Sequence, residues 1–500
     1  MSKAKEKPTT KNTVVREDGW EVVIGLEIHV QLNTRTKMFC GCEVTFGEAP
    51  NTRVCPVCLG HPGVLPVTNE KAVEYATRIA LALNCSIAER TIFHRKNYFY
   101  PDLPKAYQIS QYDLPLGLGG YLDVEMEDGD NFRVGITRVH MEEDAGKLIH
   151  AGGSSGRIDG ADYSLVDFNR GGTPLVEIVS EPDISTAEQA RAFLTQLRSL
   201  VQTLDVSDVN MEEGSLRCDA NVSLHKPGEP LGTKTELKNM NSFRFLQRGL
   251  EAEIERQVDL LESGERVAQT TVHFDPATGT VYSLRSKEEA NDYRYFPEPD
   301  LVPIELDEEY IEKVRASLPE LPAARKERLV SQYDLSVKDA ATLAANKGLG
   351  DYFESVAAAT GDARTAANWV LGELSAYLNA AALDVAASAV SAAGLVELLA
   401  LVSNGTLSGK MAKEVFEAMA QTGKDAQSIV AEKGLGQISD VGELETLVAK
   451  IVEANPQQAE QFRAGKERVL SFFVGQVMKE TRGQANPQIV NELLKKQLLI

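Results

Sequence analysis

Apolar and polar residues alternate with a period of two near the amino terminus. From Val23 to Leu32 the apolar residues are separated by Gly25, Glu27, His29 and Gln31, which is the pattern of a strand with one buried face. Because every second side chain of a strand lies on the same face, Glu27 and His29 are predicted neighbours. A carboxylate beside an imidazole on a rigid strand suits a divalent cation or an acid/base pair, while a solvated strand face fits the pattern equally well.

Further strands follow, and their polar positions are again charged. Counting by twos, Arg138, His140 and Glu142 share one face at the end of a predicted strand. In a later strand, Arg217 and Asp219 alternate against an apolar face. The predicted strands lie within residues 121–126, 133–140, 163–180 (a strand pair), 211–224 and 235–238. These repeated polar faces predict one sheet with a charged surface.

Helices are predicted where apolar residues recur at helical spacing. Residues 69–83 and 243–261 show this spacing. Ser185 and Glu188 form a capping box that opens a third helix, with its apolar stripe over 190–204. The first half of the chain therefore mixes strands with a few amphipathic helices.

The segment Arg95 to Pro115, RKNYFYPDLPKAYQISQYDLP, is rich in aromatic residues and proline. Its three prolines argue against a regular element. Arg95, Lys96 and Lys105 could hold phosphates between aromatic walls. The alternative is an aromatic loop that covers a sheet.

Beyond about residue 290 the pattern becomes almost wholly helical, with capping signals such as Ser336 and Ser408. The chain is therefore predicted to have an α+β fold, in which a mixed-sheet domain is followed by all-α domains. The expected parts are a disordered basic tail (1–19), the sheet domain (20–305), a helical domain (306–424) and a small all-α tail domain (425–500).

Length and composition narrow the class of protein. The 500 residues exceed what one hydrophobic core usually organises, and 43% hydrophobic with 25% charged residues is typical of soluble proteins. The amino-terminal residues lack the apolar stretch of a secretory signal. The apolar run 380–402 is interrupted by Asp384 and Glu397. We expect this run to be a packed helical segment and no membrane span. A cytoplasmic protein is expected. The net charge of −21 argues against indiscriminate polyanion binding but allows a local basic patch.

Four of the six cysteines form two close pairs, Cys40-x-Cys42 and Cys55-Pro-Val-Cys58. Four thiolates so spaced match the tetrahedral demand of structural zinc, although the first pair is closer than usual. Two disulfides, which need an oxidising compartment, and four inert buried thiols are the alternatives.

Several long motifs in order carry a family resemblance. They are IGLEIHVQL, the two cysteine pairs, VCPVCLGHPGVLPV, RKNYFYPDLPK, HMEEDAGKL, MEEGSLRCDANVS, TELKNMNSF and DYRYFPEPDL. From about Trp20 to the carboxyl terminus, the chain resembles the GatB/GatE family, the B subunits of the bacterial aspartyl/glutamyl-tRNA amidotransferase GatCAB. The resemblance implies a cradle domain for kinase and amidation chemistry, a helical domain and a YqeY-like tail.

The resemblance also implies a reaction, that of a glutamine-hydrolysing carbon–nitrogen ligase of protein biosynthesis. With ATP and Mg²⁺, such a complex phosphorylates the side-chain carboxylate of glutamate on tRNA(Gln), and ammonia then gives Gln-tRNA(Gln). Asp-tRNA(Asn) is converted to Asn-tRNA(Asn) in the same way. The amidase A subunit makes the ammonia, and the heterotrimer is braced by a small C subunit. In this chain the Gly/Ser-rich loop at 152–156 only superficially resembles an amidase signature and is expected to be a plain turn.

Site residues are carried over from the family's motifs. The implied Mg²⁺ site is Glu27, His29 and Glu142, and Lys96 is the candidate for holding a phosphate. The implied catalytic residues are Glu27, His29, Lys96 and Glu142; those for the nucleotide are Lys96, Arg138, Glu212, Glu213 and Asp219. The sequence contains no GxxxxGK[ST] loop, so the nucleotide is not held in the P-loop manner.

The last segment is expected to bind the tRNA body. From Ser439 onward it has eight Lys/Arg against eight Asp/Glu, a balance more hospitable to phosphate than that of the whole chain. Two rival functions are an RNA adaptor whose partners do all the chemistry and a stand-alone metal-dependent ligase. The polar strand faces favour catalysis over the first rival, and the lack of a supported ammonia-producing site disfavours the second.

Overall fold

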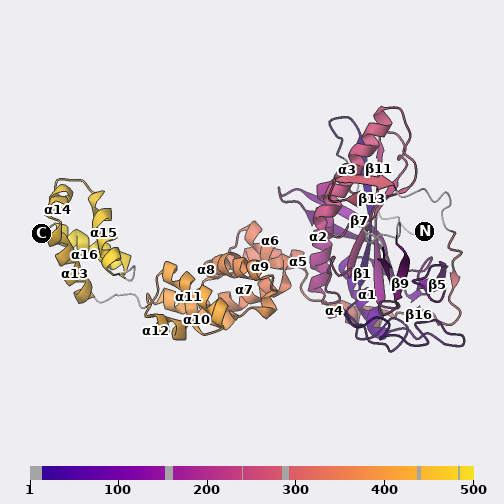
Figure 1. The fold of residues 1–500 in the computed structure, drawn as a ribbon, viewed down its shortest axis with the longest axis horizontal. Coiled ribbons are helices and arrows are strands. Elements are labelled where there is room, and N and C mark those ends of the chain that lie inside the picture. The colour runs from indigo at the N-terminus through magenta and orange to yellow at the C-terminus, as the bar shows by residue number, and fades with distance from the viewer. Residues whose placement is uncertain are drawn as a thin grey trace. The chain divides into compact units, whose positions relative to one another are not determined.

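The computed structural model describes residues 14–152, 161–238, 240–283, 292–435, 441–481 and 485–499. It divides into two compact units, Met1–Pro322 and Ala323–Ile500 (Figure 1). Most of the expected tail at 1–19 and of the expected turn at 152–156 lies outside the described residues.

A nine-stranded mixed sheet organises the first unit. All its neighbouring strands are antiparallel except β12 and β13, which are parallel. In sheet order the strands are β14 (Thr280–Ser283), β13 (Thr271–Asp275), β12 (Thr235–Lys238), β11 (Leu216–His225), β1 (Glu21–Gln31), β10 (Pro174–Ser180), β7 (Asn131–Glu143), β6 (Gly117–Glu125) and β2 (Ser86–Ile87). The α+β class predicted from the sequence is thereby confirmed.

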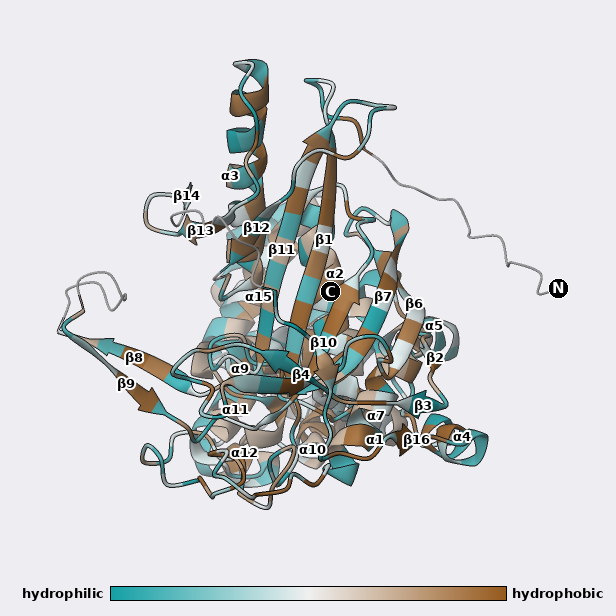
Figure 2. Cartoon of the chain, turned by 90° about the vertical axis from the view of Figure 1, so that its right-hand side faces the viewer, coloured by the Kyte–Doolittle hydropathy of each residue, from teal (hydrophilic) through white to brown (hydrophobic). Residues whose placement is uncertain are grey.

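Strand β1 alternates as its sequence predicts. Val22, Ile24, Leu26, Ile28 and Val30 are buried, and the side chains between them are partly exposed. The same alternation of apolar and polar positions runs along β11 (Figure 2). One face of the sheet is therefore core, and the other is free to carry polar groups.

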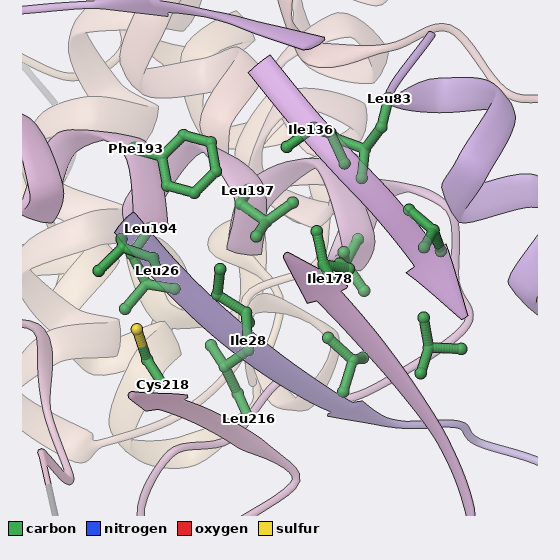
Figure 3. Close-up of a cluster of buried hydrophobic side chains, with 14 of the residues drawn as sticks. Leu26, Ile28, Leu83, Ile136, Ile178, Phe193, Leu194, Leu197, Leu216 and Cys218 are labelled. Carbon is green, nitrogen blue, oxygen red and sulfur yellow. The ribbon is translucent and has the colours of Figure 1, made fainter. Parts of the chain in front are cut away.

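Helices cover the apolar face. They are α1 (Glu70–Ala82), α2 (Ala187–Thr203) and α3 (Phe243–Glu262). Figure 3 shows Phe193, Leu194 and Leu197 of α2 against Leu26 and Ile28 of β1. All five side chains are 0–1% exposed, so this contact is a main part of the core.

The cap of α2 differs from our prediction by one residue. Thr186, not Ser185, is the N-cap, and its hydroxyl accepts from the Gln189 N–H. The Gln189 side chain reaches back to the Ser185 N–H at 2.8 Å. A Thr-Ala-Glu-Gln motif thus does the reciprocal capping that the sequence suggested for Ser185 and Glu188.

Three small sheets attach to the unit. They are β15 (Phe296–Pro297), β4 (His94–Asn97) and β5 (Tyr107–Ser110); β16 (Ile304–Glu305) with β3 (Arg90–Thr91); and β8 (Lys147–Ala151) with β9 (Tyr163–Asp167). The prediction that 95–115 lacks regular elements was wrong, because its prolines lie outside β4 and β5. The predicted pairing within 163–180 was also wrong, since β9 pairs with β8 and β10 joins the large sheet.

The first unit continues beyond the strands. Helix α4 (Glu308–Ala316) packs against α1, and buried Val314 lies on it. The compact unit therefore reaches Pro322, whereas the sequence pattern placed the end of the sheet domain at 305.

The second unit is helical and has two separate hydrophobic clusters, one over residues 329–429 and one over 444–498. Ser336 and Ser408 cap helices as predicted. The helices are α5 (Pro322–Tyr333), α6 (Val337–Ala345), α7 (Lys347–Thr360), α8 (Ala363–Trp369), a π-helical turn (Val370–Leu374), α9 (Ser375–Ala381), a 3₁₀ turn (Val385–Ala387), α10 (Ala392–Ser403), α11 (Gly409–Thr422), α12 (Ala426–Lys433), α13 (Val441–Ala454), α14 (Pro456–Arg463), α15 (Val469–Glu480) and α16 (Pro487–Leu498).

The apolar run at 380–402 is not one continuous helix. It comprises the end of α9, the 3₁₀ turn and most of α10. In the part of the chain that the structure describes, no helix combines the length and apolar character needed to cross a membrane.

Candidate active site

Four strands place charged side chains in one row on the polar face of the sheet. In register, Arg217 of β11 lies opposite His29 of β1, His29 opposite Glu177 of β10, and Glu177 opposite His140 of β7. Glu142 lies two residues beyond His140 on the same strand. The alternation of the strands thus gathers these groups without any special loop.

Two imidazoles lie among carboxylates in this row. His29 Nε2 lies 3.6 Å from Glu142 Oε1 and 3.5 Å from Glu177 Oε2. It also lies 3.9 Å from Glu27 Oε1. His140 Nε2 lies 3.3 Å from Glu177 Oε2 and 3.8 Å from Glu142 Oε2. We call Glu27, His29, His140, Glu142 and Glu177 the carboxylate–imidazole cluster.

Burial strengthens the interactions within the cluster. Glu142 and Glu177 are only 2% and 4% exposed. Burial disfavours their ionisation, but charge and hydrogen bonding from His140 outweigh it, and the pKa of Glu177 falls well below its usual range. Burial likewise opposes the charged form of His140, yet the two carboxylates raise its pKa to about 9. Glu142 and Glu177 therefore favour the ionised form although both side chains are buried.

Glu27 differs from the other two carboxylates because it is partly exposed. Partial burial raises the pKa of Glu27, and repulsion from the charge of Glu177 raises it further. A cation bound beside it would reverse this effect. Glu27 is therefore the acidic side chain of the cluster that gains most from a positive ligand.

Lys96 of β4 lies beside the cluster, between it and an aromatic group. Its ammonium is 5.0 Å from the ring centroid of Tyr293. Burial lowers its pKa, but the charge of Glu142 and then that of Tyr295 outweigh burial and raise it. Asn97 donates to the Tyr293 carbonyl at 3.1 Å and so fixes the aromatic segment on β4. A partly exposed cation therefore lies next to the carboxylates.

Three further ion pairs extend the charged face. Lys238 Nζ donates to Asp219 Oδ2 at 2.8 Å on the β12 side. Arg217 Nη2 donates to Asp144 Oδ2 at 2.9 Å, and Arg170 Nε lies 3.8 Å from the same oxygen. Anionic and cationic side chains therefore alternate across the polar face.

The structure brings together only some of the residues named from the sequence. Arg138 Nη2 lies 3.5 Å from Glu177 Oε1, at the edge of the cluster. Asp219 lies opposite Glu27 in the sheet. Glu212 and Glu213, in contrast, occupy an exposed turn before β11, where no contact with the cluster is seen.

Glu177 was missed from the sequence, although it joins the two imidazoles. Ligand atoms of Glu27, His29 and Glu177 lie within 4.8 Å of one another, as do those of His140, Glu142 and Glu177. Glu177 stands in the apolar run Pro174–Ser180, where every residue except Val179 is buried. A single acidic residue inside a buried strand is the signal that could have identified it.

The four cysteines form a second site. The Sγ atoms of Cys40, Cys42, Cys55 and Cys58 lie within 4.8 Å of one another, and those of Cys55 and Cys58 are 3.9 Å apart. Zn–S bonds of about 2.3 Å in a tetrahedron place sulfurs roughly 3.8 Å apart, so the arrangement can hold a metal ion.

A cavity of about 200 Å³ adjoins this thiol site. Its walls include Cys40, Cys58, Lys105 and Glu143. Lys105 forms a short ion pair with Glu143, the residue after Glu142. The cavity therefore lies between the thiols and the end of the strand that carries the cluster.

Comparison with known proteins agrees with this geometry. Residues 22–312 match the family model of the GatB/GatE catalytic domain, and residues 351–498 match that of the GatB domain. The chain is 55% identical over 480 residues to the B subunit of the aspartyl/glutamyl-tRNA(Asn/Gln) amidotransferase of Carboxydothermus hydrogenoformans, covering 96% of this chain and 99% of the relative. It is 56% identical over 483 residues to the protein of that name from Geobacter sulfurreducens, with the same coverage. The chain therefore belongs to the GatB/GatE family.

Proposed function

We propose that this chain is the B subunit of an aspartyl/glutamyl-tRNA amidotransferase and that its sheet domain activates the misacylated amino acid with ATP. The observation that carries the proposal is the buried carboxylate–imidazole cluster, which lies inside the match to the catalytic domain. Identity above 50% over nearly the whole chain supports the same activity.

The reaction class follows from that assignment. The side-chain carboxylate of glutamate on tRNA(Gln), or of aspartate on tRNA(Asn), takes the γ-phosphoryl group of ATP to form an acyl phosphate and ADP. Ammonia then attacks the acyl carbon, phosphate leaves, and Gln-tRNA(Gln) or Asn-tRNA(Asn) results. We assign ammonia production to an amidase A subunit and bracing to a small C subunit of a cytoplasmic heterotrimer.

Lys96 is our candidate for holding a phosphate during the phosphoryl step. Two anionic reactants must be brought together, and cationic groups must neutralise the charge that develops. Lys96 is a partly exposed cation whose charge interacts with that of Glu142, so it can hold a phosphate oxygen at the edge of the cluster. Arg138 is partly exposed on the same face and is a second candidate for the nucleotide, as is Asp219 through its partner Lys238. The roles of Glu212 and Glu213 stay predictions.

The cluster also fits a magnesium ion. Oxygens on opposite sides of Mg²⁺ are about 4.2 Å apart, close to the 4.8 Å within which the ligand atoms of Glu27, His29 and Glu177 lie. Because Mg²⁺ prefers oxygen ligands, we expect the carboxylates of Glu27 and Glu177 to hold it, with His29 direct or through water. Glu142 belongs to a second group of possible ligands, with His140 and Glu177, and we expect it to complete the site from that side. Bound there, the ion would polarise phosphate oxygens and offset their charge.

Structural zinc is the metal that best suits the thiol site. Four sulfurs with no other donor are typical of zinc sites that keep no open position. Zinc held there would fasten the loop of residues 40–58 to the sheet domain. We therefore assign it a role in folding and none in catalysis.

We further propose that residues 425–500 bind the tRNA body, and that the helical domain before them begins after Pro322, where the first compact unit ends, and reaches residue 424. The match to the GatB domain covers most of this region. The basic residues Lys479, Lys495 and Lys496 lie in the last turns of α15 and α16. Such residues can contact phosphates although the whole chain is acidic.

Reconstitution tests the proposed function and separates it from an adaptor role. The chain would be purified alone and with the A and C subunits, and ATP hydrolysis and amidation would be followed with Glu-tRNA(Gln). The wild-type complex should hydrolyse ATP only with the misacylated tRNA. The Glu142→Gln complex should lose this tRNA-dependent ATP hydrolysis, while glutamine hydrolysis by the partner subunit continues. Asp123→Asn, an exposed acid on β6, is the matched control. Full amidation by Glu142→Gln would assign the chemistry elsewhere.

A further inference from the structure

Lys37 is a lysine inside the protein. It is 1% exposed, and it is among the largest fully buried side chains of the molecule. Its ammonium lies 3.2 Å from the Phe168 carbonyl oxygen and 3.7 Å from the Cys58 sulfur. Within the described residues no carboxylate lies at ion-pair distance from it. A buried charge without a counter-charge is costly, so the sulfur is the group that can compensate Lys37.

The thiol site needs a cation for the same reason. Four thiolates around Zn²⁺ carry a net charge of −2. Other nearby cations are engaged elsewhere: Lys105 with Glu143, and Arg53 with Glu43 and Glu48. Cys58 also accepts a hydrogen bond from its neighbour, the Cys55 N–H, at 3.2 Å. Among the residues that the structure describes, Lys37 is the charged group that lies within hydrogen-bond distance of a sulfur of the site.

We propose that Lys37 is the outer partner of the metal–thiolate site, where its ammonium donates to the Cys58 thiolate and offsets part of the negative charge. This inference rests on the proposed zinc site. Residues that hydrogen-bond to metal ligands orient those ligands and change the affinity for the metal. Their loss typically weakens metal binding roughly 10- to 100-fold. Lys37 is thus a positioning residue and takes no part in the reaction.

The same lysine links the metal site to the catalytic strand. Its second contact is Phe168, and the loop that follows reaches Gly172. Gly172 accepts from the Met38 N–H at 2.8 Å and donates to the Asp144 carbonyl at 2.8 Å. At φ +87°, a Cβ on Gly172 would also lie 3.4 Å from Lys37 Cδ and 3.6 Å from Cys58 Cβ. Metal, Lys37 and this loop therefore form one packed assembly beside the end of β7.

Zinc release tests the proposal without relying on activity. The full chain would be loaded with zinc, and transfer of zinc to a chromogenic chelator would be timed for wild type and Lys37→Met. Methionine keeps the apolar stem, and an apolar replacement of a buried ion is often tolerated; Lys37→Gln is the second variant should methionine not fold. Lys71→Met, an exposed lysine of α1, is the matched control.

We expect release from Lys37→Met to be about 10-fold faster or more and release from Lys71→Met to match wild type. Hydrogen exchange of the amides at 168–172 should rise in zinc-loaded Lys37→Met, and we expect the same rise in wild type stripped of zinc. Release rates within twofold of wild type for both Lys37 variants would overturn the role of Lys37 and leave the zinc site standing. A wild-type chain that cannot be loaded with zinc would overturn both.

Discussion

Glu177 is the carboxylate that both imidazoles of the cluster share. His29 and His140 lie 3.5 and 3.3 Å from the same oxygen, Oε2. Removing its charge while keeping its shape would leave buried His140 and partly exposed His29 without their common partner. The residue is thus expected to fix the position of both rings and to help hold the magnesium ion.

Glu177→Gln should therefore lower amidation of Glu-tRNA(Gln) by the assembled complex on the order of 100-fold. The variant should fold, because glutamine has nearly the same volume. Steady-state amidation and tRNA binding would be measured in parallel, with exposed Asp123→Asn as the control. Unchanged amidation would mean that Glu177 only fills the sheet.

At the residue scale, the sequence predicted the site residues that lie on strands with alternating apolar and polar positions. It missed the site residue that lies in a strand buried on both faces. Every second residue of β1 is apolar, which identifies it as a strand, and Glu27 and His29, two residues apart, therefore share a face. Glu177 could not be found in this way, since its strand is buried almost throughout. Proximity of Lys96 to Glu142 depends on how β4 packs on the large sheet, which no local pattern encodes.

At the scale of elements, helix α2 supports β1, the strand that carries Glu27 and His29 of the cluster. Leu197 is fully buried against the sheet (Figure 3). Leu197→Ala should lower the free energy of unfolding of the first unit by about 2–5 kcal/mol, because a cavity would remain. Below the concentration of denaturant or the temperature at which the unit unfolds, the variant should still be folded and catalytically active.

Urea unfolding can isolate this effect, since the chain has only two tryptophans. Trp20 belongs to the first unit and Trp369 to the second, so Trp369→Phe leaves a reporter for the sheet domain alone. Arg191→Ala, on the exposed side of α2, is the control and should change stability by less than about 0.5 kcal/mol. Equal stability of the Leu197→Ala and control proteins would contradict the packing described for α2.

The longer elements of the sheet domain, such as β1, β11, α2 and α3, were predictable because each has a strong local period, whereas the short strands β2 to β5 and β13 to β16 were not predicted. What failed was choice among near-equal alternatives. Ser185 with Glu188 and Thr186 with Gln189 both fit a capping template, and the structure uses the second. Strands β9 and β10 were recognised, but their partners lie far away in sequence, and hydrogen-bond pairing over such distances leaves no local trace.

At the scale of the whole molecule, the described residues form three separate hydrophobic clusters. The first supports the sheet with the carboxylate–imidazole cluster, and the other two belong to the helical unit. The sequence showed the change from strands to helices but not where the first unit ends. An amphipathic helix such as α4 has the same period whether it packs on a sheet domain or on other helices.

Truncation tests this division. A chain ending at residue 438 lacks the third hydrophobic cluster, residues 444–498, and the basic residues near the carboxyl terminus. It should bind misacylated tRNA about 10-fold or more weakly, because phosphate contacts are lost, while glutaminase activity of the assembled complex continues. Binding of the tRNA would be measured at fixed salt. Equal tRNA affinity would show that the tail has another role.

Magnesium dependence connects the carboxylate–imidazole cluster to activation of the substrate carboxylate. The most direct measurement is a magnesium titration of amidation by complexes carrying Glu27→Gln or Glu142→Gln, with tRNA binding and glutaminase followed in parallel. Both variants should require far more magnesium than wild type, or lose amidation at every concentration, while tRNA binding and glutaminase stay normal. Near-normal amidation by either variant at limiting magnesium would contradict the proposed role of the cluster and leave these residues as a polar strand face.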